Sequence, residues 1–436
     1  MKILLCAEFF YPSVGGAQEV VKQLAVRLLQ RGHEITVVTS ILKERQSDDY
    51  LGIKIRSFAI SGNLANGLTG DMEQYRKFIK DGHFDLIFIY AAQQWTFDAI
   101  WNELPELTAR KVFVPCGYSG LGNPGYQEYF QRLPRILKCF DAAIYHAYEY
   151  QDYQYAIQHQ LQNSIFIPNG ADEKEFSCAP NRRFRAENNI AADALVLLTV
   201  GVLNGAKGHL EVAKAFGATH FKGSATLILN GNSMPSPDER LTSLVAKAKC
   251  LVNTRGIPGA ARFVLGRVAR RLGFKLDYVA RLKRLTLAIN DGRTGSNKNV
   301  LIVDLARSDL LTAFFEADLF VFASLIEYSP LVLYEACAAG LPFLTVPVGN
   351  AREIVEWTKG GEICPAQVDH DGFTRVEPAQ LAAHIERLVN DPQRLTELGA
   401  SGRTAWENRF NWNALATEYE ELFLKLTSAP NQKSNP

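Results

Sequence analysis

The chain has 436 residues, 47% of them hydrophobic and 21% charged, an ordinary globular composition whose length predicts two domains. Its seven cysteines are scattered and show no zinc-ligand spacing, so we expect no disulfide framework and a reducing cytoplasm as the compartment. The start, MKILLCAEFFYP, lacks the features of a signal peptide, and no apolar run of about 18 residues is free of charge, which argues against a membrane-spanning helix.

Short apolar runs rich in β-branched and aromatic residues alternate with helical patterns through the first half of the chain. The helical pattern is clearest in AQEVVKQLAVRLLQR, at 17–31. Strands that are apolar throughout and are joined by helices predict a parallel sheet that is covered on both faces. The predicted strands of this half are 2–9, 34–40, 53–60, 84–90, 111–117, 141–147 and 164–170.

A polar stretch at 181–193 predicts a linker, and a second series of strands follows it. This organisation predicts an α/β fold with two Rossmann-like domains facing a central cleft, which is the expected ligand site. We place 1–175 in the first domain, joined by a C-terminal helix near 411–427. The second domain is 176–410, with an insertion at 232–299 where the rhythm breaks. Its predicted strands are 194–201, 225–231, 300–304, 319–324 and 342–348.

The first predicted strand is followed by YPSVGGAQE, at 11–19, and then by the first helix. Gly15 and Gly16 can bring bare backbone close to a ligand, and the start of a helix offers free N–H groups that attract phosphate. The spacing is not GxGxxG, which argues against a nicotinamide-dependent oxidoreductase. A tight strand-to-helix turn without a ligand is the alternative for these glycines.

Two glutamates, Glu327 and Glu335, stand in a stretch at 321–342 that is otherwise almost wholly apolar or small. A buried carboxylate is costly unless something pairs with it. Glu327 falls in the loop at the carboxyl end of a predicted strand, where α/β proteins bind ligands. Ser329 is a predicted N-cap and Pro330 suits the first turn of the helix that carries Glu335. A hydroxyl-rich ligand, such as a ribose diol, would satisfy both carboxylates; capping or surface glutamates are the alternative.

Four segments in the same order resemble the retaining glycosyltransferases of family 4, which have the GT-B fold. SLIEYSPLVLYEACAAGLP resembles the family's E-x7-E segment, and IPNGADEKEF, at 167–176, resembles its interdomain segment. YPSVGGAQEVVKQLAVRLLQRGHEITVVTS resembles its glycine loop, first helix and second strand, and GVLNGAKGH, at 201–209, resembles its donor loop. The resemblance covers nearly the whole chain except 232–299.

This resemblance implies a nucleotide-sugar donor bound as a co-substrate, with no cofactor and no metal. Lys207 would neutralise the donor diphosphate, where charge develops as the bond breaks, and Gly16 would lie beside it. Glu327 would contact the transferred sugar and share the catalytic role with Lys207, and Glu335 would contact the nucleotide ribose. The other donor-binding residues that the resemblance implies are Gly15, Ser329, Pro330 and Leu331.

Two positions depart from the family's pattern. The arginine of its "GRL" is Val202 here, and valine cannot supply the charged fork with which arginine binds phosphate. The histidine that many members carry near the acceptor is Cys116, with His146 and His209 as alternatives by motif position. Cys116 and His146 are therefore weak acceptor-side candidates, and a structural or solvated histidine is the other interpretation of His146. DHD, at 369–371, lies in a polar loop, and we interpret it as solvated rather than metal-binding.

Positive charge concentrates between 247 and 298, where 13 Lys or Arg stand against 2 Asp or Glu. This net charge of +11 leaves −10 on the remainder of a chain whose total is +1. Apolar stripes at helical spacing within 262–274 and 278–289 predict a basic helical hairpin inserted in the second domain. Such helices either lie on an anionic membrane or dock on the acidic body of the protein. Nucleic acid is not expected, because no stacking aromatics are interleaved with the basic residues.

Together these features predict a cytoplasmic, retaining, metal-independent, hexosyl-type glycosyltransferase. UDP is favoured over GDP in the nucleotide-sugar donor, the acceptor would be a glycan or a lipid-linked acceptor, and peripheral membrane association through 247–298 stays open. The alternative is a catalytically weakened, sugar-nucleotide-binding partner subunit of a glycosyltransferase complex. The two departures support this alternative, and the intact Lys207, Glu327 and Glu335 oppose it.

Overall fold

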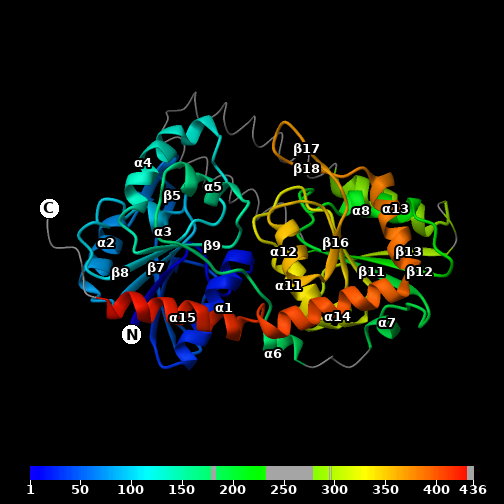
Figure 1. Cartoon of the computed structure of the whole chain (residues 1–436), viewed down its shortest axis with the longest axis horizontal. Helices are drawn as coiled ribbons and strands as arrows, with labels where there is room; N and C mark the ends of the chain where they lie inside the picture. The colour runs from blue at the N-terminus through cyan, green and yellow to red at the C-terminus, as the bar shows by residue number, and fades with distance from the viewer. Residues whose placement is uncertain (178–182, 232–277, 294, 296, 430–436) are drawn as a thin grey trace. The chain divides into compact units, whose positions relative to one another are not determined.

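The computed structural model describes residues 1–177, 183–231, 278–293, 295 and 297–429, which fall into two compact units (Figure 1). Unit 1 consists of Met1–Glu173, Tyr328–Leu331 and the chain from Asn408 onward, and unit 2 consists of Lys174–Glu327 and Val332–Glu407. The sequence placed the domain boundary between 175 and 176, and the structure places it between Glu173 and Lys174. Part of the predicted linker, 178–182, lies outside the described residues.

Unit 1 is built on an eight-stranded sheet with the strands β1 (Lys2–Cys6), β2 (Glu34–Ser40), β3 (Asp49–Tyr50), β4 (Ile53–Phe58), β7 (Leu86–Tyr90), β8 (Arg110–Val114), β9 (Ala142–Tyr145) and β10 (Ser164–Phe166). The strand order is β10-β9-β8-β7-β1-β2-β4-β3, and only the short edge strand β3 pairs antiparallel. Every residue of β7 and β9 is buried, as expected for a parallel sheet covered on both faces. A separate hairpin pairs β5 (Ile60–Asn63) with β6 (Gly67–Gly70).

Helices cover both faces of this sheet (Figure 1). The helices of unit 1 are α1 (Gly16–Gln30), α2 (Met72–Asp81), α3 (Trp95–Asp98), α4 (Gln127–Leu137), α5 (Gln151–Gln158) and α15 (Trp412–Ser428). One face packs on α1 and α15 and the other on α2, α3 and α4. The C-terminal helix that the sequence placed near 411–427 is α15, and it also pairs with the end of α1 through Arg31 and Glu420, 2.8 Å apart.

Unit 2 contains a six-stranded, wholly parallel sheet with the strands β11 (Leu195–Val200), β12 (Ala225–Asn230), β13 (Lys298–Val303), β14 (Leu319–Phe322), β15 (Phe343–Thr345) and β16 (Gly361–Ile363). Its order is β13-β12-β11-β14-β15-β16. A small hairpin pairs β17 (Gln367–Val368) with β18 (Thr374–Arg375). The helices that begin in unit 2 or just before it are α6 (Glu173–Phe176), α7 (Phe184–Glu187), α8 (His209–Ala218), α10 (Arg307–Glu316), α11 (Leu331–Ala338), α12 (Ala351–Thr358), α13 (Pro378–Val389) and α14 (Pro392–Asn408).

The second half of the predicted basic hairpin is a helix at 278–290. Tyr278, Leu282 and Ile289 of its apolar stripe are 5%, 1% and 0% exposed, and the Tyr278 hydroxyl accepts a hydrogen bond from the Leu210 backbone N–H of α8 at 3.2 Å. This stripe is therefore docked on the protein and is not available to a membrane. The first predicted helix, at 262–274, lies outside the described residues.

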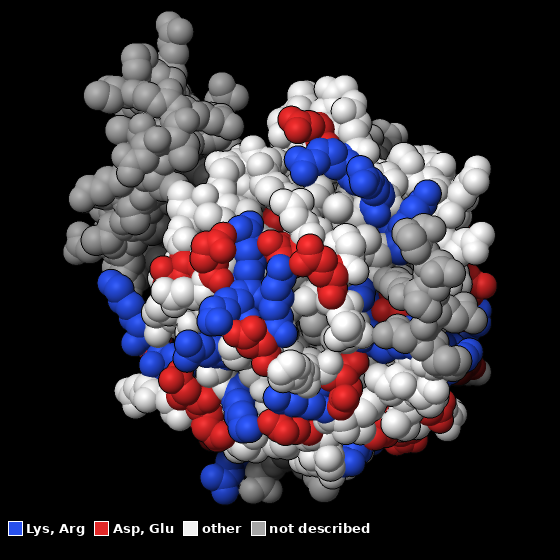
Figure 2. Space-filling view, turned by 90° about the vertical axis from the view of Figure 1, so that its left-hand side faces the viewer, with Lys and Arg blue, Asp and Glu red and all other residues white. Residues whose placement is uncertain are grey.

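Charges of both signs are mixed on the α2 side of unit 1 (Figure 2). Here Lys77 pairs with Asp81 at 2.9 Å and Lys80 pairs with Glu106 at 3.0 Å. Exposed pairs of this kind contribute little to stability. On the face that Figure 2 shows, the basic side chains of the described residues alternate with acidic ones.

Candidate functional site

The strand order of unit 2 creates a switch point between β11 and β14. From β11 the chain continues to β12 on one side, and from β14 it continues to β15 on the other. In open parallel sheets, ligands bind outside the carboxyl ends of the strands where the order reverses in this way. The loops that follow β11 and β14 carry the sequence-predicted Lys207 and Glu327. The topology therefore places both residues at the expected ligand edge.

Lys207 and Glu327 form an ion pair at this edge. Lys207 Nζ lies 2.5 Å from Glu327 Oε1, and the two side chains are 28% and 14% exposed. The hydroxyl of Ser324 also donates to Glu327 Oε1, at 2.8 Å. A half-buried carboxylate held by an ammonium group and a hydroxyl has a fixed position, whereas the ammonium group keeps donors for a further anion.

Backbone contacts hold the two loops together. The backbone N–H of Leu325 donates to the Ala206 carbonyl at 2.8 Å, and the Ser324 hydroxyl lies 3.0 Å from the same oxygen. Gly208 precedes α8 with a φ of 72°, and a Cβ there would collide with the Ala323 carbonyl oxygen. Glycine is required at 208 because this left-handed, closely packed turn brings Lys207 beside the loop after β14.

The second glutamate of the motif belongs to a different ion-pair cluster in unit 2. Arg307 Nη2, at the start of α10, lies 2.6 Å from Glu335 Oε1 and 2.5 Å from Glu175 Oε2 of α6. Burial lowers the pKa of the Arg307 guanidinium, but the charges and hydrogen bonds of Glu335 and Glu175 outweigh this and raise it. Arg307 was not among the residues predicted from sequence. Its position just after the predicted strand 300–304 was the available signal, because ligand-binding loops follow such strands.

The glycine loop and part of the E-x7-E segment belong to unit 1. Gly16 begins α1, and a Cβ built there would meet nothing nearer than Leu331 Cδ1 at 4.0 Å. Packing inside the protein therefore does not demand glycine at this position, which favours a bare backbone kept for a ligand. Gly15 precedes the helix with extended backbone, at a φ of 173°.

Ser329 and Pro330 come just before α11, which begins at Leu331. Ser329 was the predicted N-cap, but its hydroxyl has no hydrogen-bond partner among the described residues. A buried hydroxyl without a partner is costly, and a bound ligand would satisfy it.

The two acceptor-side candidates lie inside unit 1. His146 is 1% exposed; its Nδ1 donates to the Ile167 carbonyl at 2.7 Å, and burial lowers its pKa to about 4. Nε2 then accepts from the Tyr90 hydroxyl, 3.4 Å away. Cys116 has a positive φ of 57°, and burial, then the Asp152 charge, raise the pKa of its thiol to about 12. A neutral imidazole and a protonated thiol in these surroundings fit structural roles.

A buried carboxyl, Asp152, organises this part of unit 1 and was not predicted. It accepts hydrogen bonds from the backbone N–H groups of Gly117 and Tyr153, at 3.0 and 2.9 Å, and bonds the Tyr328 hydroxyl. Burial raises the pKa of Asp152 to about 6 in spite of these bonds. Tyr328, the residue after Glu327, also accepts from the His146 backbone N–H at 3.0 Å. The middle of the E-x7-E segment is thus fixed by a polar network in unit 1.

The remaining sequence candidates have plain structural surroundings. His209 is fully buried, burial lowers its pKa to about 4, and Nε2 lies 3.4 Å from the Asn230 carbonyl. Val202 is 42% exposed, so the missing arginine leaves an open apolar side chain. In DHD, the Asp369 carboxylate accepts from the backbone of Asp371 and Phe373, which stabilises the turn between β17 and β18.

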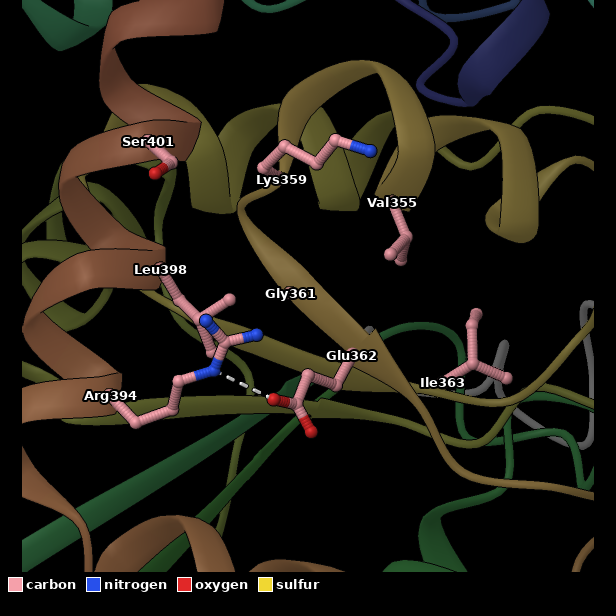
Figure 3. Close-up of a pocket in the computed structure, with 8 residues that line it drawn as sticks. All are labelled: Val355, Lys359, Gly361, Glu362, Ile363, Arg394, Leu398 and Ser401. Atoms are coloured by element: carbon pink, nitrogen blue, oxygen red, sulfur yellow. Dashed lines mark hydrogen bonds and ion pairs between the residues drawn. The ribbon is translucent and has the colours of Figure 1, made fainter.

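A surface pocket elsewhere in unit 2 contains no sequence-predicted site residue (Figure 3). It lies between the end of α12, strand β16 and helix α14, and its apolar lining includes Val355 and Leu398. The Arg394 Nε donates to Glu362 Oε1 at 2.9 Å across the pocket, and Arg387 pairs with the same carboxylate. The Glu362 carboxylate already has two arginine partners, and the pocket lies away from the switch point of the sheet, so we do not take it as the site.

A family model described as glycosyl transferases group 1 matches residues 293–405, which include Arg307, Glu327 and Glu335. The D-inositol 3-phosphate glycosyltransferase of Thermobispora bispora is 35% identical over 107 residues, covering 24% of this chain and 23% of that protein. These matches span about a quarter of the length of the curated relatives, 23% and 27% in the first two.

Solved structures of low sequence identity share the fold over almost the whole chain. Sucrose-phosphate synthase from Thermosynechococcus elongatus has a TM-score of 0.66 at 20% identity, covering 98% of both chains. The Anabaena protein Alr3699/HepE, solved in complex with UDP, has a TM-score of 0.67 at 17% identity, covering 98% of this chain and 100% of that one. With its two Rossmann-like units, the chain has the GT-B fold.

Proposed function

We propose that this GT-B chain, with its glycosyl transferases group 1 segment, transfers a sugar from a nucleotide-sugar to an acceptor hydroxyl. The observation that carries the proposal is the Lys207–Glu327 ion pair at the switch point of unit 2. Two oppositely charged side chains are kept partly exposed there, at the edge where parallel sheets bind ligands. The group 1 match of 293–405 supports the assignment.

In this function Lys207 stabilises the negative charge that develops on the departing diphosphate, and Glu327 positions the transferred sugar through its hydroxyls. The sugar C1–phosphate oxygen bond breaks, and the acceptor oxygen forms a bond to C1. We assign transfer with retention, in which the acceptor attacks from the face the diphosphate leaves and a phosphate oxygen takes its proton. Such a reaction relies on electrostatic stabilisation, and we propose that it needs no metal or cofactor.

We favour a UDP-linked hexose as the donor. Alr3699/HepE has been solved with UDP and also with UDP-glucose, and it shares the fold over 98% of this chain. The proposed acceptor is a glycan or a lipid-linked glycan.

We keep a cytoplasmic location, with peripheral contact to an anionic membrane, as a prediction. Of the described helices, none is long and apolar enough to cross a membrane. In the helix at 278–290, Arg281, Lys283 and Arg284 are exposed. If these cations contribute about 1 kcal/mol each at an anionic surface, their replacement by Gln should reduce sedimentation with anionic liposomes. Unchanged sedimentation would remove this helix from any membrane contact.

The function is tested by a thermal-shift screen with UDP-, GDP- and ADP-sugars, followed by a donor-hydrolysis assay. A ligand present at 100 times its Kd should stabilise the protein by about 2.7 kcal/mol. Stabilisation by one nucleotide class together with release of that nucleotide supports the enzyme. Stabilisation without any hydrolysis or transfer would favour a sugar-nucleotide-binding partner subunit, for which the missing cation at Val202 is the structural argument. No stabilisation and no turnover would contradict both.

A further inference from the structure

The proposed chemistry gives no role to one ion-pair cluster of unit 2, which is formed by Arg307, Glu335 and Glu175. Arg307 follows β13, Glu335 lies in α11 and Glu175 lies in α6. Three separate elements therefore converge on one guanidinium group. Glu335 is only 14% exposed, so its charge is partly removed from water and needs a partner.

Arg307 is itself held in place from the other side. Its Nε lies 3.3 and 3.2 Å from the two carboxylate oxygens of Glu175, and Nη2 adds a third contact, so the pair is fork-like. Phe176, the residue after Glu175, is fully buried and packs against Phe314 and Phe315. Its ring centroid lies 5.9 Å from the guanidinium carbon of Arg307. A core aromatic thus fixes α6, α6 fixes Arg307, and Arg307 fixes Glu335.

The geometry leaves one side of Glu335 available. Among the described residues, hydrogen bonds from side chains reach only Oε1 of this carboxylate. Because Arg307 holds Oε1, the rotamer of Glu335 is fixed before a ligand binds. Oε2 can then accept a hydrogen bond from a ligand hydroxyl. The cluster has two carboxylates for one cation, a net charge of −1, which suits hydroxyl donors and repels phosphate. Arg307 is accordingly a poor substitute for the phosphate-binding cation missing at Val202.

We propose that Arg307 is a positioning residue for the donor site: it holds Glu335 so that the free carboxylate oxygen meets the ribose hydroxyls of the bound nucleotide. This role rests on the proposed function. It predicts that Arg307 acts on donor binding and only through Glu335. Sugar transfer itself, which we assign to Lys207 and Glu327, should proceed normally once the donor is bound.

The test is a double-mutant cycle on the full-length chain, with binding of UDP, GDP and ADP measured by titration calorimetry. Arg307→Met should raise the Kd of the preferred nucleotide by about tenfold, the effect expected for a lost charge-assisted hydrogen bond. The donor KM should rise similarly while kcat stays within about twofold. Arg307→Lys should recover part of the affinity, because it keeps a cation but loses the fork. Arg387→Met, which breaks the ion pair with Glu362 on the surface of unit 2, is the matched control and should change neither constant.

The decisive comparison is made in the Glu335→Gln background, where Arg307→Met should have no further effect on Kd. An equal loss in both backgrounds, or tighter binding in the single variant, overturns the positioning role while leaving the glycosyltransferase assignment standing. Circular dichroism and the melting temperature identify a variant that has merely lost its fold, and Arg307→Lys then carries the comparison. A wild-type chain that binds none of the three nucleotides overturns both this role and the proposed function.

Discussion

The charged groups of the candidate site in unit 2 differ from the buried carboxyls of unit 1 in how they are compensated. Lys207 with Glu327, and Arg307 with Glu335, are opposite charges in direct contact and partly exposed. Asp98 and Asp152 of unit 1 are instead buried, and they accept hydrogen bonds from backbone N–H groups and tyrosine hydroxyls. Burial raises the pKa of Asp98 to about 7 and that of Asp152 to about 6.

This difference separates a candidate binding site from a structural network. The partly exposed carboxylates of unit 2 are each held by a basic side chain, and such a carboxylate can exchange one partner for a ligand. A buried carboxyl held by neutral donors moves toward its protonated form, because burial penalises the charge more than the hydrogen bonds favour it. Raised carboxyl pKa values by themselves would have selected unit 1, whereas the fold topology and the ion pairs favour unit 2.

The largest expected effect comes from removing the cation of the unit 2 site. Lys207→Ala should lower kcat by about 10²–10³-fold, the loss typical of deleting one group that stabilises transition-state charge. The measurement is a product assay at saturating donor. Lys214→Ala, an exposed lysine on the following helix, is the control and should behave as wild type. Normal turnover in Lys207→Ala would show that another cation stabilises the leaving diphosphate.

Substitutions of the two glutamates of the motif should have different effects: one should weaken nucleotide binding and the other should slow sugar transfer. Glu335→Gln should raise the Kd of the nucleotide by about tenfold, because a charge-assisted hydrogen bond to the ribose becomes a neutral one. Glu327→Gln should change nucleotide affinity less and reduce transfer more, because its proposed contact is with the sugar. Calorimetry with the nucleotide and a transfer assay distinguish the two. Equal nucleotide affinity in Glu335→Gln and wild type would remove the ribose role.

A smaller and pH-dependent effect is expected in unit 1. The unfolded Asp98 carboxyl ionises near pH 4, whereas the folded one holds its proton to about pH 7, so its contribution to stability is lost as pH rises through this window. Asn does not titrate. The melting temperature of Asp98→Asn minus that of wild type should therefore increase as the pH is raised from 4.5 to 8. Each kcal/mol of wild-type stability lost corresponds to about 2–4 °C. A difference that does not change with pH would mean that Asp98 is ionised in the folded protein.

The smallest expected effect is that of a chelator. Transfer should continue in EDTA at the rate of the untreated enzyme, because Lys207 is assigned the charge-neutralising role that a divalent ion has in other enzymes. Loss of transfer in EDTA that manganese restores would overturn the metal-independent assignment. The control is the same assay with EDTA already saturated with manganese.

The alternation of long apolar strands with helices could be predicted from sequence because it depends on local periodicity. Helix 17–31 is α1 (Gly16–Gln30), and strand 34–40 is β2 (Glu34–Ser40). The short strands β3, β5, β6, β16, β17 and β18 were missed because two to four residues carry too little periodicity to be distinguished from a loop. At the N-terminus of α11, the unpartnered Ser329 hydroxyl shows that residue type alone does not decide a cap.

The sequence by itself determined which groups are the candidates for the site, because Lys207, Glu327 and Glu335 stand in short motifs whose spacing along the chain is visible directly. Only the tertiary structure decided their partners. Lys207 meets Glu327 across 120 positions of the chain and Arg307 meets Glu335 across 28, because the strand order brings the loops after β11, β13 and β14 to one edge of a sheet. Burial was decided in the same way: whether His146 is a neutral structural group or a solvated one depends on desolvation by residues far away in sequence, which no local pattern records.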